Sequence, residues 1–433
     1  MNRKKRILLQ KSRRISVLVF SILMILGCFI GALFFVRPTT SSVEKRTLTT
    51  FPSFTISSFL DGSYFSQIST WYADTYPGRD ALISMNSKVK DTYGIQGQTM
   101  MVGGQTQSDD IPDEATQGKT RKKKKAEVPD QTQMQEEMQN QIMQGLYVEN
   151  GAAYGMYYFT QEAADTYIDG INKSAKKLDG TTKVYSILVP NNSIVLDKKL
   201  QDKLGGSDQE KAIDYYMDSY SDKVGKVDAI ERLKKHRDEY LYFKTDHHWT
   251  ALGAYYAYQE FCDVKGIKAH KLDYYKTQKT PRFLGSYYAE LQLKDMEKDP
   301  DKVIAYIPKA TNKLTFWRDG VKYDGNVITS PDLWDENSQY MQFIHGDQPL
   351  TKITNKKIKD GSSCVVLKES YGNCFVPFLV DHYETVYVMD FRYTDEDPYK
   401  FCKEKKIDDL IVINNIQIIS NNEVSTVIGD MIS

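Results

Sequence analysis

Two short segments of the chain hold residue types that could carry out acyl transfer. One reads Asp246-His247-His248-Trp249 and contains two of the six histidines of the chain. The other reads Lys368-Glu369-Ser370-Tyr371-Gly372-Asn373 and follows an apolar run. A serine hydroxyl becomes a nucleophile when an imidazole removes its proton, and a carboxylate fixes the tautomer of that imidazole. The two segments together therefore suggest a serine nucleophile with its base.

The spacing within the first segment assigns the roles. Asp246 and His248 are two residues apart, so in an extended chain their side chains project to the same side. We expect Asp246 to bind one ring nitrogen of His248 and to leave the other nitrogen for Ser370. His247 would then point the opposite way. The predicted catalytic residues are Ser370, His248 and Asp246.

Other interpretations of the same residues stay open. An Asp-x-His pair can be half of a metal site, although the sequence offers no evident third ligand. The pair can also be a satisfied polar network in the core. A serine after a strand is often a turn residue or a helix cap. Cys374 is a second possible nucleophile, but it lies one turn deeper and we expect it in the core.

Short apolar strands alternating with helices would position these residues. Strands are expected at residues 184–189, 240–243, 364–367, 386–389 and 410–413, and helices near 161–178 and 251–264. This alternation predicts an α/β fold with a mainly parallel sheet covered on both faces. Active groups in such sheets lie beyond the carboxyl ends of the strands, where Ser370 and the Asp246 segment are placed.

Oxyanion donors are expected at the same edge of the sheet. The backbone N–H groups of Ser370 and Tyr371 are the first choice. Asn414 and Asn415 follow the strand at 410–413 and are further candidates, although asparagines at a strand end are commonly turn residues. No substrate-binding residues can be named from the sequence.

The N-terminus predicts a membrane anchor. A basic tail at residues 1–14 precedes 22 uncharged residues at 15–36, which would span roughly 33 Å as a helix, enough for a bilayer core of about 30 Å. The positive-inside rule places the tail in the cytoplasm and residues 37–433 outside it. Cleavage as a signal peptide near Gly31-Ala32 is the alternative.

The segment 103–145 has a different composition from the rest of the chain. It contains no aromatic residue, is rich in Gln, Asp, Glu and Lys, and includes a basic run at 121–125. Such a segment buries too little apolar surface to offset its ordering entropy, which predicts a disordered insertion in the domain at 37–433. Met134, Met138 and Ile142 could add a helical turn or two at its end.

Composition excludes several other classes of function. Lys+Arg and Asp+Glu are equal at 57 each, so the net charge offers no argument for nucleic acid binding. The five cysteines include no CxxC pair, which gives no indication of a zinc site or of a disulfide framework. We expect no metal and no cofactor.

Several segments in order resemble a known family. The run Thr245-Asp246-His247-His248-Trp249-Thr250 resembles the signature of the DHHW proteins, which are similar to alginate O-acetyltransferases and to SGNH hydrolases. Further matching blocks lie at residues 44–48, 74–79, 189–192, 283–287 and 369–373. The resemblance implies an SGNH-hydrolase-like α/β sandwich with Ser370, His248 and Asp246 as triad, in a permuted order because Asp-x-His precedes the serine. The usual Gly-x-Asn-Asp block of SGNH proteins is missing.

The resemblance also implies an activity. The chain would be a membrane-anchored, extracytoplasmic O-acetyltransferase that passes acetyl groups through an acyl-serine to a cell-surface or secreted polysaccharide. A membrane-bound O-acyltransferase would be the partner that supplies the acetyl group. A polysaccharide acetyl-esterase is one alternative, because water and a sugar hydroxyl attack the same intermediate. A non-catalytic polysaccharide-binding or scaffold subunit of an acetylation complex is the other.

Overall fold

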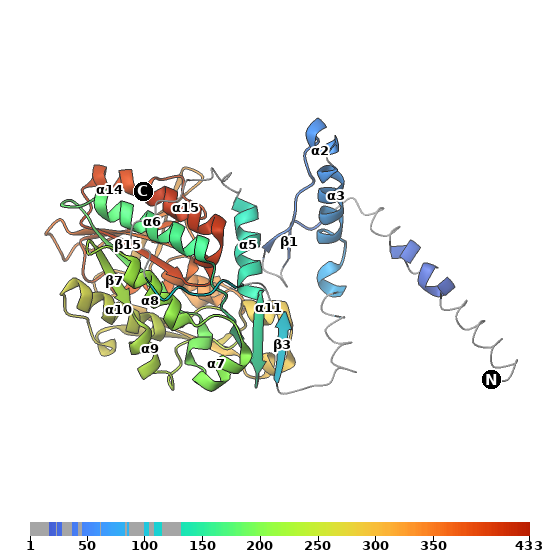
Figure 1. The fold of residues 1–433 in the computed structure, drawn as a ribbon, viewed down its shortest axis with the longest axis horizontal. Coiled ribbons are helices and arrows are strands. Elements are labelled where there is room, and N and C mark those ends of the chain that lie inside the picture. The colour runs from blue at the N-terminus through green and yellow to red at the C-terminus, as the bar shows by residue number, and fades with distance from the viewer. Residues whose placement is uncertain are drawn as a thin grey trace, which may run out of the picture. The chain divides into compact units, whose positions relative to one another are not determined.

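The structure is a computed structural model that describes residues 17–22, 24–27, 37–41, 46–60, 62–82, 85, 99–103, 108–114 and 131–433. The chain divides into two compact units, Met1–Gln96 and Gly97–Ser433. Figure 1 shows the ribbon. The first unit contains β1 (Thr40–Ser41), β2 (Arg46–Thr47), α2 (Ile56–Leu60) and α3 (Ser63–Asp74). The second unit holds both segments singled out in the sequence.

An eight-stranded sheet organises the second unit. Its strand order is β11-β10-β12-β14-β13-β15-β6-β7. The last five strands in this order are parallel to one another, and the first three add antiparallel pairs at one edge. The strands are β6 (Lys183–Val189), β7 (Val224–Asp228), β10 (Lys313–Arg318), β11 (Val321–Asn326), β12 (Leu350–Thr354), β13 (Ser363–Lys368), β14 (Thr385–Asp390) and β15 (Asp409–Asn415).

Helices cover both faces of this sheet, as the buried apolar strands predict. Alternate residues of β15 enter two different hydrophobic clusters: Ile411 and Ile413 pack with α10 (Ala251–Lys265), and Leu410 and Val412 pack with α6 (Gln161–Lys177) and α15 (Asn422–Ile432). Figure 1 shows α6 and α15 on one side of the strands and α10 on the other. The predicted mixed α/β fold is therefore confirmed.

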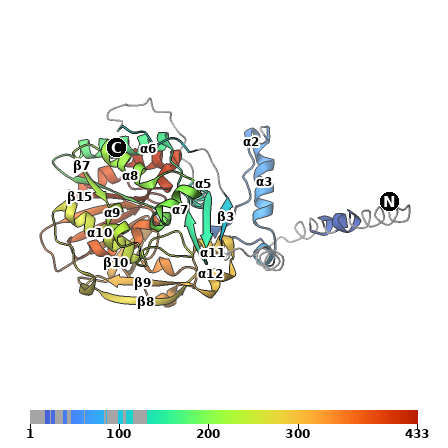
Figure 2. The same cartoon turned by 60° about the horizontal axis from the view of Figure 1, so that its bottom comes forward.

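The remaining elements surround this core, and Figure 2 shows several of them from a second direction. Two smaller antiparallel sheets are formed by β3 (Thr99–Gly103), β4 (Gly145–Glu149) and β5 (Ala152–Gly155), and by β8 (Lys276–Phe283) and β9 (Asp301–Ile307). The other α-helices are α5 (Gln131–Met143), α7 (Lys198–Leu204), α8 (Gln209–Ser219), α9 (Ile230–Lys235), α11 (Ser286–Leu291), α12 (Lys294–Lys298), α13 (Val376–Leu379) and α14 (Pro398–Lys405).

The end of the predicted insertion is folded. Helix α5 covers Gln131–Met143, and its Met134, Met138 and Ile142 are all buried in the core cluster that includes α6 and α15. The prediction of disorder is wrong for this part, because three apolar side chains at a spacing of four residues form one buried stripe. Residues 104–107 and 115–130 of the same segment lie outside the described residues.

The membrane anchor stays a prediction. Within the described part of the chain, no helix is both long enough and apolar enough to cross a membrane. Of the predicted anchor at 15–36, the structure describes only 17–22 and 24–27, and the basic tail at 1–14 lies outside the described residues.

Candidate active site

A tight loop carries Asp246 and His248. Residues 244–248 are a series of bends, and an antiparallel bridge between Tyr242 and Trp249 closes them. The predicted strand at 240–243 is therefore wrong, since this segment makes only that single bridge. The loop leads directly into α10, where the Thr250 hydroxyl accepts a hydrogen bond from the Gly253 N–H at 3.3 Å and caps the helix.

Ser370 lies just beyond the end of β13, at the start of the 3₁₀ turn η5 (Ser370–Cys374). The Glu369 carboxylate caps this turn by accepting from the Tyr371 N–H at 2.8 Å. The Trp249 indole N–H donates to the Tyr371 carbonyl at 2.9 Å. This bond ties the Asp246 loop to the serine turn, although 122 positions separate Trp249 from Tyr371.

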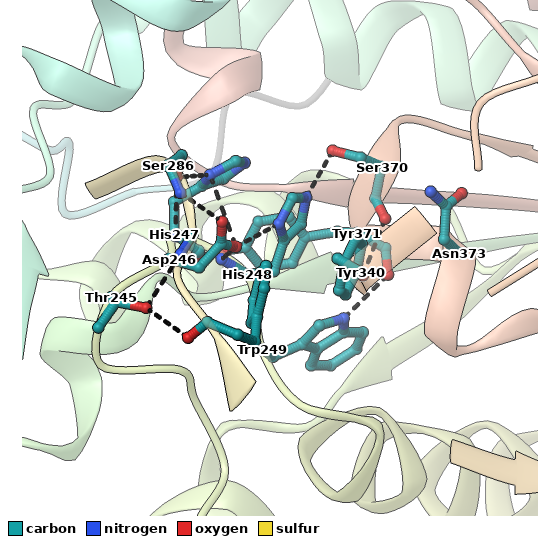
Figure 3. A network of polar contacts seen from close by, with 12 residues as sticks. Thr245, Asp246, His247, His248, Trp249, Ser286, Tyr340, Ser370, Tyr371 and Asn373 are labelled. Atoms are coloured by element: carbon teal, nitrogen blue, oxygen red, sulfur yellow. Dashed lines mark hydrogen bonds and ion pairs between the residues drawn. The ribbon is translucent and has the colours of Figure 1, made fainter. Parts of the chain in front are cut away.

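The structure brings the three predicted catalytic residues together (Figure 3). The Ser370 hydroxyl lies 2.7 Å from Nε2 of His248, and Nδ1 of His248 lies 2.5 Å from Oδ1 of Asp246. Because a carboxylate only accepts, Nδ1 carries the hydrogen and Nε2 is left as the acceptor for the serine hydroxyl. All three residues are buried, with exposed fractions of 9%, 6% and 4% for Ser370, His248 and Asp246.

Asp246 is held in this position as an anion. Its Oδ2 accepts from the Ser286 N–H at 2.7 Å, and its Oδ1 also accepts from the His248 N–H at 2.9 Å. Burial alone would raise the pKa of Asp246, but the neighbouring imidazoles of His248 and His247 and these hydrogen bonds outweigh burial and place it well below its usual range. A permanent negative charge therefore faces Nδ1 of His248.

The extended-chain spacing predicted that His247 points away from the site, and this prediction is wrong. Its ring centroid lies 3.8 Å from that of His248, with the ring planes inclined by 37°. The rule that alternate side chains point to opposite faces holds for a strand, and these residues are in a bend instead. Both histidines thus line the same site.

Two of the predicted oxyanion donors, the Tyr371 N–H and Asn415, are engaged elsewhere. The Tyr371 N–H donates to Glu369, because that carboxylate acts as the cap of the turn. The Asn415 backbone N–H also donates to Glu369, at 2.9 Å, and its side-chain amide donates to the Val189 carbonyl at 3.3 Å. Asn414 Oδ1 accepts from the Tyr167 hydroxyl at 3.0 Å, whereas the Asn414 amide nitrogen is buried without a hydrogen-bond partner among the described residues. None of these groups has a bond directed at the Ser370 hydroxyl.

The structure adds His247 to Asp246 and His248 as a possible third metal ligand, which the sequence did not indicate. Asp246, His247 and His248 each offer one donor atom within 4.8 Å of the others. However, both nitrogens of His248 already bind Asp246 and Ser370. The same two bonds are those that an acid–base function requires, so the arrangement favours proton transfer over metal ligation.

Cys374 lies in the core, as expected. Its side chain is fully buried, and burial raises the pKa of the thiol to about 12. A protonated, enclosed thiol is a poor nucleophile. Cys262, Cys364 and Cys402 are likewise free and buried.

The sequence did not identify three residues that support the site. Ser286 begins α11 and donates its backbone N–H to Asp246, while the Glu369 carboxylate joins the ends of β13 and β15. Tyr340 packs on the ring of His248. Gly285 and Ser286 belong to the block at 283–287 that resembled the DHHW family, so that resemblance was the one available signal.

Comparison with known proteins agrees with this fold. A DHHW protein from Eubacterium siraeum is 27% identical, with a TM-score of 0.58 over 65% of this chain and 94% of its own. PatB1 from Bacillus cereus is 21% identical, with a TM-score of 0.57 over 64% of this chain and 98% of its own. A second PatB1 structure, which carries a sulfonyl adduct, is 19% identical over the same shares of the two chains, with a TM-score of 0.55. No curated protein matches the chain.

The family model described as DHHW protein matches residues 44–121 and 127–389. This match covers most of the chain, including the bend with Asp246 and the turn with Ser370. The resemblance that the sequence blocks suggested is thereby confirmed, and the chain belongs to the DHHW protein family.

Proposed function

We propose that this protein is an O-acetyltransferase that passes acetyl groups to a cell-surface or secreted polysaccharide. The observation that carries the proposal is the chain of two hydrogen bonds from Asp246 through His248 to the Ser370 hydroxyl, at 2.5 and 2.7 Å. These distances are within the reach that direct proton transfer requires. The choice of acetyl group and polysaccharide rests on the resemblance of the sequence blocks to alginate O-acetyltransferases.

The proposed reaction has two halves. Ser370 Oγ attacks the acetyl carbonyl carbon while His248 Nε2 takes the hydroxyl proton, and Asp246 stabilises the imidazolium that forms. The bond between the acyl carbon and the donor oxygen then breaks, that oxygen takes the proton from His248, and acetyl-Ser370 remains. A sugar hydroxyl then gives its proton to His248 and attacks the acetyl carbonyl. The bond from the acyl carbon to Ser370 Oγ breaks, His248 returns the proton to Ser370, and the O-acetylated sugar is released.

We propose that the fold is SGNH-hydrolase-like with the permuted motif order, and that residues 15–36 anchor the chain in a membrane with the catalytic unit outside the cytoplasm. A membrane-bound O-acyltransferase would supply the acetyl group. Protease added to intact spheroplasts should then cut the chain within residues 115–130. Protection until the membrane is broken would contradict this orientation.

The central test is to trap the intermediate. The full chain in detergent is incubated with p-nitrophenyl acetate, quenched in acid and mapped by mass spectrometry, with Ser370→Ala as the control. We expect an added acetyl group on Ser370 that the control lacks. A phenylmethanesulfonyl fluoride adduct on the same serine would be independent support. An unlabelled serine under both reagents would remove the catalytic proposal.

Adding an acceptor separates transfer from hydrolysis. If the protein is a transferase, acetylated sugar oligomers should accumulate and free acetate should fall when a polysaccharide fragment is added. If acetate release is unchanged with every acceptor, water is the acceptor and the protein is an esterase.

A further inference from the structure

His247 is placed beside the reacting groups but has no role in the Asp246–His248–Ser370 relay. Its ring lies against that of His248, and Figure 3 shows the two rings next to each other, with Ser370 hydrogen-bonded to the ring of His248. The His247 side chain is 13% exposed, so it is packed but still reachable. A polar ring in this position can contact a group bound to Ser370.

Ser286 contacts one of the two ring nitrogens of His247. The Ser286 hydroxyl oxygen accepts from the His247 backbone N–H at 3.3 Å and lies 2.7 Å from Nδ1 of the same residue. The hydroxyl has one hydrogen of its own and can donate it to Nδ1. In the tautomer that this bond implies, the neutral ring carries its hydrogen on Nε2, the nitrogen farther from Ser286.

His247 is neutral at any working pH. Burial is the main cause that lowers the pKa of His247 to about 3, and the charges of His248 and Arg392 lower it further. The carboxylates of Asp246 and Asp347 act in the opposite direction but do not outweigh these effects. Above that pH the ring is an imidazole that donates one hydrogen bond without giving up its proton. A neutral donor does not compete with Nε2 of His248 for the proton of Ser370.

The site also needs such a donor. An acyl-transfer site stabilises the negative charge that develops on the carbonyl oxygen with positioned hydrogen-bond donors. The Tyr371 N–H and both the backbone N–H and the side-chain amide of Asn415 are bonded elsewhere, so the Ser370 N–H would act together with a further donor. We propose that the Nε2–H of His247 donates a hydrogen bond to the carbonyl oxygen of the acyl group as that oxygen becomes negative. This inference rests on the proposed acyl-transfer function.

The acylation step conserves protons and electrons. The Ser370 oxygen bonds to the acyl carbon, its proton moves to His248, and the carbonyl π electrons move to the oxygen. That oxygen accepts the hydrogen bond from His247, which keeps its proton throughout. The electrons then return, the bond to the leaving oxygen breaks, and the leaving oxygen takes the proton from His248.

Two isosteric variants of the full chain test the proposal. In His247→Gln, the side-chain amide can place a donor near the former Nε2 position but loses the acceptor near Ser286. In His247→Asn, the amide can keep a partner for Ser286 but has no donor at the far position. Hydrolysis of p-nitrophenyl acetate is measured for both, with thermal unfolding to show that each is folded.

The proposal predicts opposite outcomes for this pair. His247→Asn should lose about 100- to 1000-fold in kcat with little change in KM, the usual cost of one oxyanion donor, and His247→Gln should lose less than about 10-fold. If Asn retains the activity and Gln loses it, His247 is a structural partner of Ser286 and the proposal is wrong. Equal loss in two folded variants would also overturn it.

The same assay separates this proposal from the proposed function. An inert wild-type protein, or activity that survives Ser370→Ala, would refute the acyl-transfer function itself. Activity that depends on Ser370 but is kept in His247→Asn would refute only the role of His247.

Discussion

The ring of Tyr340 lies flat against the ring of His248, with centroids 3.9 Å apart and planes inclined by 13°. The Tyr340 hydroxyl donates to the backbone carbonyl of Ser370 at 3.0 Å. One side chain therefore contacts both the proposed base and the turn that carries the proposed nucleophile. Stacking of this kind limits rotation of the imidazole about its side-chain bonds and helps to keep Nε2 directed at Ser370.

Substitutions at Tyr340 should separate these two contacts. Tyr340→Phe keeps the stacked ring and loses a hydrogen bond worth about 1 kcal/mol, so we expect a loss of about 5-fold in esterase kcat. Tyr340→Leu loses the flat ring, and a small misplacement of His248 can cost about 100-fold. Steady-state kinetics with p-nitrophenyl acetate measures both. A leucine variant as active as the phenylalanine variant would show that stacking does not position His248.

Gly285 leaves the space that the Asp246 side chain occupies. A Cβ at position 285 would overlap both the Cβ and the carboxylate of Asp246. Gly285→Ala should displace that carboxylate from Nδ1 of His248 and lower kcat by about 100-fold, because near-attack geometry is lost. Gly180→Asn is the control: its φ is +77°, which asparagine tolerates, and an added Cβ has open space. Wild-type kinetics in Gly285→Ala would show that the loop adjusts without cost.

A buried charge network beside the site should link stability to pH. Lys368 Nζ lies 2.9 Å from Asp347 and 2.6 Å from Asp390, and Arg392 lies 3.0 Å from Asp347. Burial alone would raise the pKa of Asp347, but the charges of Arg392 and Lys368 outweigh burial and lower it well below its usual range. Its contribution to stability is therefore fully present above the unfolded-state pKa of about 4 and is lost as the pH falls below that value.

Asp347→Asn tests this linkage. At pH 7 the variant should be about 3 kcal/mol less stable, because two buried cations lose one carboxylate partner. The difference from wild type should shrink as the pH is lowered from about 4 toward 3. Urea unfolding followed across this range gives both quantities, with Asp319→Asn on an exposed turn as the control. A difference that stays constant with pH would show that Asp347 does not titrate with folding.

Some of this arrangement could be predicted from the sequence, and some could not. The apolar strand before Ser370 and the identity of Asp246 and His248 follow from local patterns that the fold retains. The predicted direction of the His247 side chain was wrong, because the chain was assumed to be extended and is bent at residues 244–248. Tyr340 and Ser286 come from distant segments, so their contacts with His248 and Asp246 depend on tertiary packing that no local pattern encodes.

Helix α5 provides the last test, because its residues read as disordered by composition and are buried in the structure. Met138 has an exposed fraction of only 5% within the core cluster that includes α15, so Met138→Ala should cost about 2–5 kcal/mol of unfolding free energy. Gln139 on the same helix is exposed, and Gln139→Ala should change stability by less than about 0.5 kcal/mol.

Replacing residues 115–130 with a flexible Gly/Ser bridge should also leave the melting temperature nearly unchanged, since the cost of loop closure depends weakly on length. Deleting all of 103–145 should instead lower it strongly, because that deletion removes α5. Equal melting temperatures for the short and the long deletion would contradict the packing of α5.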